Sequence, residues 1–128
     1  MKHGIGRSTR LLGLALAGFA PVALAHHGWD WAEQEQSTLD ATVVSVSMTP
    51  PHPGLQVRAD DGSTWKIDLG NPNQTERSGF RADSARAGDR ISVLGNRNRD
   101  AAKKHMKAVR IVVEGTPYVL YPERLQAP

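Results

Sequence analysis

Short runs of alternating apolar and polar residues, separated by Gly, Pro and Asp, fill most of the sequence after residue 37. Alternation puts every second side chain on the same face of an extended strand, so each run predicts a strand with one buried face. Five runs show this pattern, and a short sixth strand can follow at residues 118–121. Their expected inward residues are Leu39, Ala41 and Val43; Leu55, Val57 and Ala59; Trp65, Ile67 and Leu69; Ile91 and Val93; and Val109, Ile111 and Val113. We therefore expect an all-β domain.

Two local signals shape this domain. The apolar phase slips by one residue after Val43, which predicts a β-bulge that bends the first strand. After the third strand, Asn71 suits a helix N-cap, Pro72 the first helical position and Gly79 the helix end. Three strands, one short helix and two further strands are the order of an OB-like β-barrel. Another small barrel, or a sandwich with an inserted helix, is the alternative.

Residues 1–25 have the features of a secretory signal peptide. A basic start precedes the apolar run LLGLALAGFAPVALA, and the segment contains no acidic residue. The run is shorter than the roughly 20 apolar residues that span a bilayer, and Pro21 interrupts it. The small residues Ala23 and Ala25 predict cleavage before His26. An uncleaved anchoring segment is the alternative, but we expect a periplasmic protein without membrane attachment after cleavage.

Cleavage would change the charge of the chain. The sequence has 16 basic and 13 acidic residues, and three of the basic ones lie within residues 1–25, so 13 of each sign remain. A formally neutral domain gives no support for nucleic-acid binding. There is no cysteine, which excludes disulfides, thiol catalysis and zinc–thiolate sites.

Residues 26–37 are polar apart from two tryptophans, so we interpret them as an extended N-terminal arm. The tryptophans could pack on the barrel and fasten this arm, or stack on a ligand. These residues are Trp29 and Trp31. The barrel domain is then assigned to residues 38–122, and residues 123–128 are expected to form a flexible tail.

Three histidines could together hold a metal ion. If His26 is the first residue after cleavage, its α-amine and its imidazole Nδ1 can chelate one ion, and nitrogen ligands of this kind suit Cu(II). His27 or His52 can supply a further imidazole, and prolines stiffen the TPPHPG loop that carries His52. Cleavage one residue earlier, before Ala25, would also create a copper-chelating terminus. The alternative is a solvated histidine pair and an ordinary turn histidine.

Thioether ligands are a second option for copper. Met48 lies four residues before His52, and its sulfur would suit Cu(I), as would that of Met106. Methionine in a strand more often fills the core. His105 lies among three lysines, so we expect it to be a solvated loop residue.

Several landmarks occur in a fixed order: HHGW at 26–29, TPPHPG at 49–54, and DLGNPNQTERSGF at 68–80, which leads into AGDRISVLG. In this order they resemble a family of small secreted bacterial proteins defined by a domain of unknown function. The chain departs from the family pattern at Pro50, where Asn is usual, and at Trp29, where Phe is common. The resemblance implies a secreted, β-rich protein and brings no established activity. A weaker similarity connects the chain to OB-like periplasmic copper carriers, which use His, Met and a tryptophan face.

The sequence therefore predicts a periplasmic metal-binding protein that sequesters or delivers copper through His26, His27 and His52. The alternative is a binding module without metal, which recognises a protein, peptide or small ligand through the barrel face and the arm tryptophans. A copper redox enzyme is a third option, but no catalytic motif supports an enzyme. A periplasmic protein partner fits either binding hypothesis, and the sequence does not indicate the oligomeric state.

Overall fold

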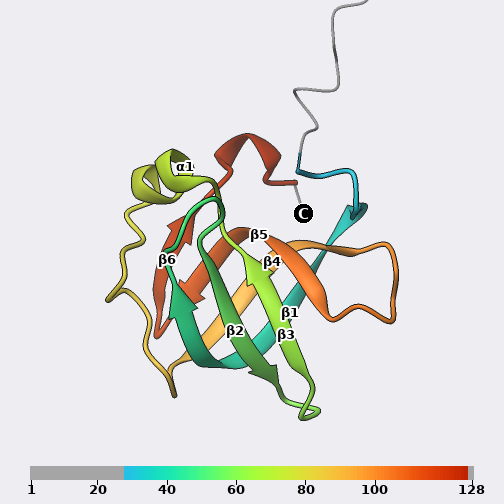
Figure 1. The fold of residues 1–128 in the computed structure, drawn as a ribbon, viewed down its shortest axis with the longest axis horizontal. Helices are drawn as coiled ribbons and strands as arrows, with labels where there is room; N and C mark the ends of the chain where they lie inside the picture. The colour runs from blue at the N-terminus through green and yellow to red at the C-terminus, as the bar shows by residue number, and fades with distance from the viewer. Residues whose placement is uncertain (1–27, 127–128) are drawn as a thin grey trace, which may run out of the picture.

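The computed structural model describes residues 28–126, which form six strands and two short helices. The strands are β1 (Ala32–Ser47), β2 (Gly54–Ala59), β3 (Thr64–Asp68), β4 (Arg90–Asn98), β5 (His105–Val113) and β6 (Thr116–Val119). Helix α1 (Pro72–Arg77) lies between β3 and β4, and the 3₁₀ turn η2 (Pro122–Arg124) follows β6. The strand order in the sheet is β3-β2-β1-β4-β5-β6, and sequential neighbours in this order are antiparallel (Figure 1).

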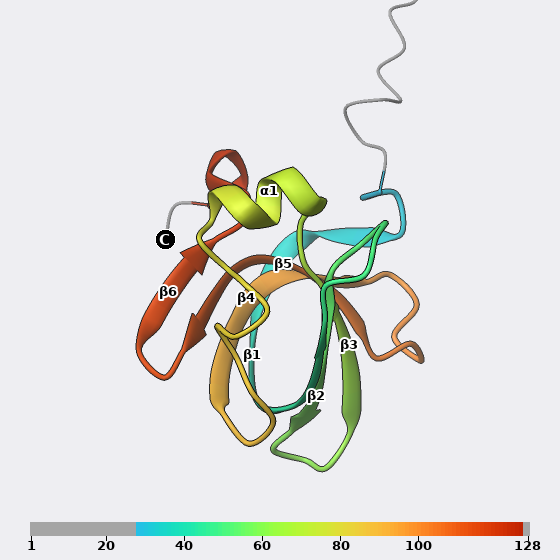
Figure 2. The same cartoon turned by 60° about the vertical axis from the view of Figure 1, so that its left-hand side comes forward.

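One parallel pairing closes the first five strands into a ring. Strand β3 pairs with β5 through Lys66 with His105, Ile67 with Met106, and Asp68 with Lys107. Strand β6 stays outside this ring, and α1 lies over one end of it (Figure 2). The prediction of an all-β, OB-like barrel with one short helix is therefore confirmed.

Most of the core is formed by the side chains that the alternating sequence pattern predicts to point inward. All the inward residues expected from the sequence are buried, and Phe80 and Leu120 add to them from outside the strands. Helix α1 begins as its sequence indicates: the Asn71 side-chain oxygen accepts a hydrogen bond from the Gln74 amide at 2.8 Å, and Pro72 is the first helical residue.

Two irregularities bend the barrel wall. The β1–β2 register shifts between Val43 and Ser45, which leaves Val44 36% exposed and confirms the predicted bulge. The β4–β5 register shifts between Leu94 and Gly95. A Cβ atom on Gly95 would lie 2.0 Å from the carbonyl oxygen of Lys107, so only glycine allows the two backbones to approach this closely.

Strand β1 begins at Ala32, six residues before the start that the sequence predicts, so half of the expected arm is strand. The pairing there is irregular, because Ala32 faces Asn98 and the next paired residue is Gln36. Between them, the Asn96 side-chain amide donates to the carbonyl oxygens of residues 33 and 34, at 2.9 and 3.2 Å. A polar side chain thus replaces part of the strand ladder, and apolar alternation cannot reveal such a segment.

Two residues of the predicted tail, Arg124 and Gln126, make hydrogen bonds to the first part of β1. The Gln36 side-chain amide donates to the Arg124 carbonyl oxygen, and the Gln126 side chain donates to the Gln34 carbonyl oxygen at 3.1 Å. Residues 123–126 therefore lie against the first part of β1. Within residues 28–126, no helix has the length and apolar character needed to cross a membrane.

Candidate functional site

The segment that leads into β1 is held at one end of the barrel, the same end that carries the β1–β2 loop (Figures 1 and 2). Trp29 provides the main attachment. Its ring meets Tyr121 edge-on at a centroid distance of 5.0 Å, and the Arg124 guanidinium carbon lies 3.9 Å from its centroid. Its carbonyl oxygen accepts a hydrogen bond from the Ala32 amide at 3.0 Å. Trp29 therefore packs on the C-terminal part of the chain.

Trp31 covers the seam between β3 and β5. Its ring stacks on His105 with a centroid distance of 4.0 Å and an interplanar angle of 12°. On the seam, His105 Nε2 lies 3.0 Å from Asp68 Oδ2, although the two groups make no aligned hydrogen bond. The prediction that His105 is a solvated loop residue is wrong, because it opens β5 and lies partly buried under Trp31.

Lys107 is the third polar residue on this seam. It is only 4% exposed, and its Nζ lies 5.2 Å from the Trp29 ring centroid and 5.8 Å from that of Tyr121. Burial lowers the pKa of Lys107, the nearby Arg124 charge lowers it further, and Asp68 opposes this by raising it. We call Asp68, His105 and Lys107 the seam cluster. Trp31 thus stacks on one member of this cluster, His105, and Trp29 lies beside another, Lys107.

The predicted metal ligands fall into two groups. His26 and His27 lie outside the described residues. His52 is exposed in the β1–β2 loop, next to the buried Pro53, whose carbonyl oxygen accepts a hydrogen bond from Leu69 at 2.9 Å. Within residues 28–126, no three His, Asp or Glu side chains converge on a point where they could hold a metal ion.

The two methionines differ in accessibility. Met48 is partly buried and packs against the core, and Met106 is completely buried in β5. Core packing therefore accounts for Met106, whereas Met48 keeps some exposed surface at the start of the loop that carries His52.

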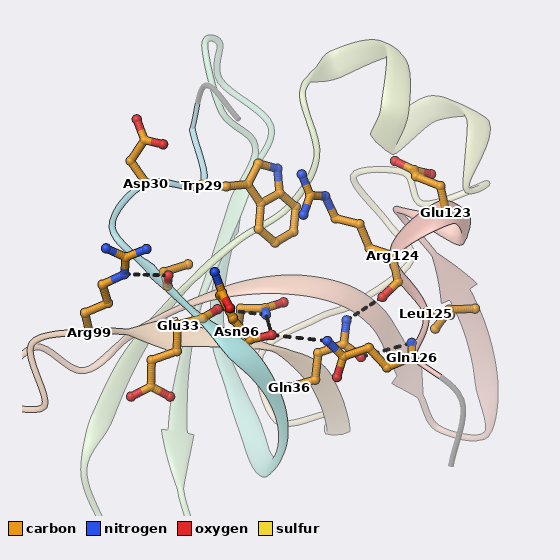
Figure 3. A pocket seen from close by; sticks show the side chains of 12 residues that line it. Trp29, Asp30, Glu33, Gln36, Asn96, Arg99, Glu123, Arg124, Leu125 and Gln126 are labelled. Carbon is orange, nitrogen blue, oxygen red and sulfur yellow. Dashed lines mark hydrogen bonds between the residues drawn. The ribbon is translucent and has the colours of Figure 1, made fainter. Parts of the chain in front are cut away.

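A groove of about 620 Å³ lies beside Trp29 and was not predicted from the sequence (Figure 3). Its polar lining comes from β1, from the β4 end and from the η2 segment. The lining residues are Trp29, Asp30, Ala32, Glu33, Gln34, Gln36, Asn96, Arg99, Glu123, Arg124, Leu125 and Gln126. Asn96 is 6% exposed, and its side-chain oxygen has no hydrogen-bond partner among residues 28–126. Strand periodicity gives no signal for this residue, because it lies in the polar run that follows Gly95.

A second groove, of about 440 Å³, lies on the other side of the β1 start. Two cations of this groove lie over the Trp65 ring, Arg97 at 5.0 Å and Lys104 at 5.3 Å from its centroid. Trp65 is only 6% exposed, because these two side chains cover the part of its ring that faces the groove. Little ring surface is therefore left for a ligand.

Comparison with protein-family models gives one match, which covers residues 14–107 and is described as a family of unknown function. Comparison with curated proteins gives no match.

Among solved structures, a complex of TiaS with a tRNA, AMPCPP and agmatine is similar over 62% of this chain, with 15% identity and a TM-score of 0.48. A complex of TiaS with a tRNA and ATP has 14% identity and a TM-score of 0.49, and a tRNA fluorescent labeling enzyme has 14% and 0.48, each over 62% of this chain. The matched region is 18% of each of those chains.

Proposed function

Since the chain belongs to DUF6152, a family of unknown function, we propose a function from its own residues: the mature protein binds a metal ion, preferably copper, and sequesters or delivers it. The ligands are His26 with its α-amine, His27 and the loop residue His52. Nitrogen donors of this kind suit Cu(II), which also has the highest affinity among the divalent first-row ions.

The attachment of the arm is the observation that carries this proposal. Trp29 follows His27 by two residues and is fixed by Tyr121, Arg124 and its hydrogen bond to Ala32. A fixed Trp29 restricts the volume that the preceding histidines can explore, so less conformational entropy is lost when they bind an ion.

His52 is restrained in a similar way. Proline precedes and follows it, and Pro53 is buried and hydrogen-bonded to Leu69, so the backbone on the C-terminal side of His52 is anchored to the barrel. The imidazole itself is exposed and open to an ion. Both restrained segments lie at the same end of the barrel (Figure 2).

Nearby cations limit where the ion can be held. Lys107 Nζ lies 3.4 Å from the position that a Cβ atom would have on Gly28, and Arg124 lies over Trp29. Like charges repel a bound cation, so the proposed site must lie toward the His52 loop and away from Lys107.

The alternative binding module would recognise its ligand through the barrel face and the arm tryptophans. Trp29 and Trp31 instead contact Tyr121, Arg124 and His105, which favours the packing interpretation over ligand stacking on these rings. The metal hypothesis does not need free rings, and it gains from tryptophans that hold the arm in place.

The test begins with the exported protein. Mass spectrometry gives its first residue and any bound metal, and copper titration with paramagnetic resonance shows whether nitrogen atoms coordinate Cu(II). We expect one tight site per chain. His52→Ala should weaken it about tenfold or more, or about 1.4 kcal/mol. Thr49→Ala, an exposed change in the same loop, should leave it unchanged.

A second variant tests the amino terminus directly. One glycine added before His26 removes the chelate between its own α-amine and its imidazole, so copper affinity should fall while the barrel keeps its stability. Copper binding no tighter than that of a scrambled N-terminal peptide, or equal binding by His52→Ala and the unmodified protein, would falsify the proposal.

A further inference from the structure

We infer that the second groove, between the start of β1 and the β4–β5 loop, is a binding site for a phosphate group. Three cations of its lining hold this anion: Arg97 on β4, and Lys103 and Lys104 in the loop. The anion binds to these charges and not to the Trp65 ring, which they cover. The site uses none of the proposed copper ligands, so it does not depend on the proposed function.

Arg97 is the most firmly held of these cations. Its side chain is partly buried, and its Nε donates a hydrogen bond to Ser37 Oγ at 2.9 Å. Its guanidinium carbon lies 5.0 Å from the Trp65 ring centroid. Within residues 28–126, its two terminal nitrogens make neither a hydrogen bond nor an ion pair. A guanidinium fixed in this way presents two adjacent donors, which suit two oxygens of one phosphate group.

Lys104 places a second positive charge over the same ring, with its Nζ 5.3 Å from the Trp65 centroid. The two charges are therefore no farther apart than the two centroid distances together. The ring beneath them is itself fixed, because Trp65 Nε1 donates a hydrogen bond to Ser63 Oγ at 3.0 Å. Like charges that share one groove repel each other, and an anion between them replaces this repulsion with attraction.

Hydrogen bonds order the β4–β5 loop, which projects from the barrel on the side where β1 begins (Figures 1 and 2). The Asp100 amide donates to the Asn98 side-chain oxygen, and the Lys103 amide donates to the Asp100 carbonyl oxygen, both at 2.9 Å. The Lys104 carbonyl oxygen accepts from the Lys66 amide of β3 at 2.9 Å, which joins the loop to the barrel wall. The backbone that carries both lysines therefore loses little conformational entropy when an anion binds.

Carboxylates of the protein itself set the kind of anion that can bind. Glu33 and Glu35 are exposed on β1 and line the same groove, but neither forms an ion pair within residues 28–126. Asp61, a further carboxylate near Lys104, instead accepts hydrogen bonds from the Ser63 amide and hydroxyl. A ligand carboxylate brings one negative charge, whereas a phosphate group brings about 1.5 to 2 at pH 7 and three acceptor oxygens. The higher charge outweighs repulsion by the two glutamates and matches three cations.

Nuclear magnetic resonance titration of the ¹⁵N-labelled exported protein tests the site. The probe is inorganic phosphate, and acetate at matched ionic strength is the control anion. The Trp65 indole N–H and the Arg97 Nε–H report on this groove, and the Trp29 indole N–H reports on the first groove. We expect saturable 1:1 binding of phosphate, shifts at Trp65 and Arg97 but not at Trp29, and acetate binding that is at least about tenfold weaker.

Variants that change the charge in both directions identify the groove. Arg97→Gln should weaken phosphate binding at least about tenfold, and Arg97→Lys should restore part of the loss because it keeps the charge without the paired donors. Lys103→Gln, an exposed change, should weaken binding about two- to fivefold. Glu35→Gln should tighten it by a similar factor, and a misfolded protein would not show this gain. Arg110→Gln, which removes an exposed charge on β5 outside the groove, is the matched control and should have no effect.

Methyl phosphate decides the source of the phosphate group. Tighter binding of methyl phosphate than of inorganic phosphate assigns the site to phosphate esters, and the reverse order assigns it to the free ion; either order supports the site. His52→Ala should bind phosphate like the unmodified protein, so failure of the copper proposal and failure of this one are distinguishable. Acetate binding as tight as phosphate binding, shifts that do not saturate, or equal phosphate affinities of Arg97→Gln and Arg110→Gln would overturn the proposal.

Discussion

At the scale of single residues, Lys107 is the most unusual side chain. It lies at a buried position of β5, yet its ammonium group is close to the aromatic rings of Trp29 and Tyr121. Contacts of a cation with Trp29 and Tyr121 recover part of the hydration energy that burial removes. The pKa of Lys107 is lowered, and the main cause is desolvation by burial. The aromatic contacts therefore do not fully compensate for the lost hydration of the ammonium group.

Lys107→Met should therefore stabilise the protein at pH 7, by about 1 kcal/mol, because an apolar chain of similar length keeps the packing without the buried charge. Lys107 releases its proton in the folded protein at a lower pH than in the unfolded chain. The stability of the unmodified protein should therefore rise between its lowered pKa and the ordinary value of 10.5. The advantage of the variant should shrink over this interval. Urea denaturation of both proteins at pH 7 and at pH 10 measures it, and an advantage that stays constant or grows would contradict the explanation.

At the scale of elements, the β-bulges decide the shape of the barrel wall. The bulge in β1 could be predicted, because Val43 and Val44 interrupt a clear alternation of apolar residues. The β4–β5 irregularity at Gly95 could not, since one glycine before a polar run also fits the end of a strand. The sequence did not predict the first part of β1 for a related reason. Carbonyl oxygens there accept hydrogen bonds from the Asn96 and Gln126 side chains instead of from a neighbouring strand.

Gly95→Ala should be strongly destabilising, because the new methyl group would collide with the Lys107 carbonyl oxygen and force two paired strands apart. Overpacking of this kind costs about 1–3 kcal/mol or more. For a domain of this size, each kcal/mol lowers Tm by roughly 4–8 °C. Thermal unfolding compared with Ser92→Ala, a change on the same strand, measures the effect. A Gly95→Ala protein as stable as the control would show that β4 can move away from β5 at little cost.

At the scale of the whole molecule, the two ends of the described chain stabilise each other. Trp29 packs on Tyr121 and Arg124, while Gln36 and Gln126 connect β1 to the last residues. These contacts join positions about 90 residues apart, and each involves polar or aromatic side chains outside the period-two pattern. The sequence predicted that the arm tryptophans could pack, but it could not show which residues would receive them.

Removal of residues 122–128 should therefore release the arm while leaving the ring intact. The Ala32 amide, which donates to the Trp29 carbonyl oxygen, should exchange with solvent roughly tenfold faster or more, and amides in the centre of β1 and β4 should keep their protection. The copper affinity that we propose above should decrease as well, since Trp29 would no longer be fixed on Arg124. Hydrogen exchange followed by mass spectrometry tests this against a control that lacks only residues 127–128. Equal exchange at Ala32 in both proteins would mean that the C-terminal residues do not hold the arm.

The ring itself closes on three residue pairs between β3 and β5, against eight between β1 and β4. Because so few residue pairs join β3 to β5, these two strands can separate while every other strand pairing is kept. The barrel would then become an open, curved sheet. Trp31 stacks on His105 at that line, so the residue directly before β1 is in contact with the closure of the ring.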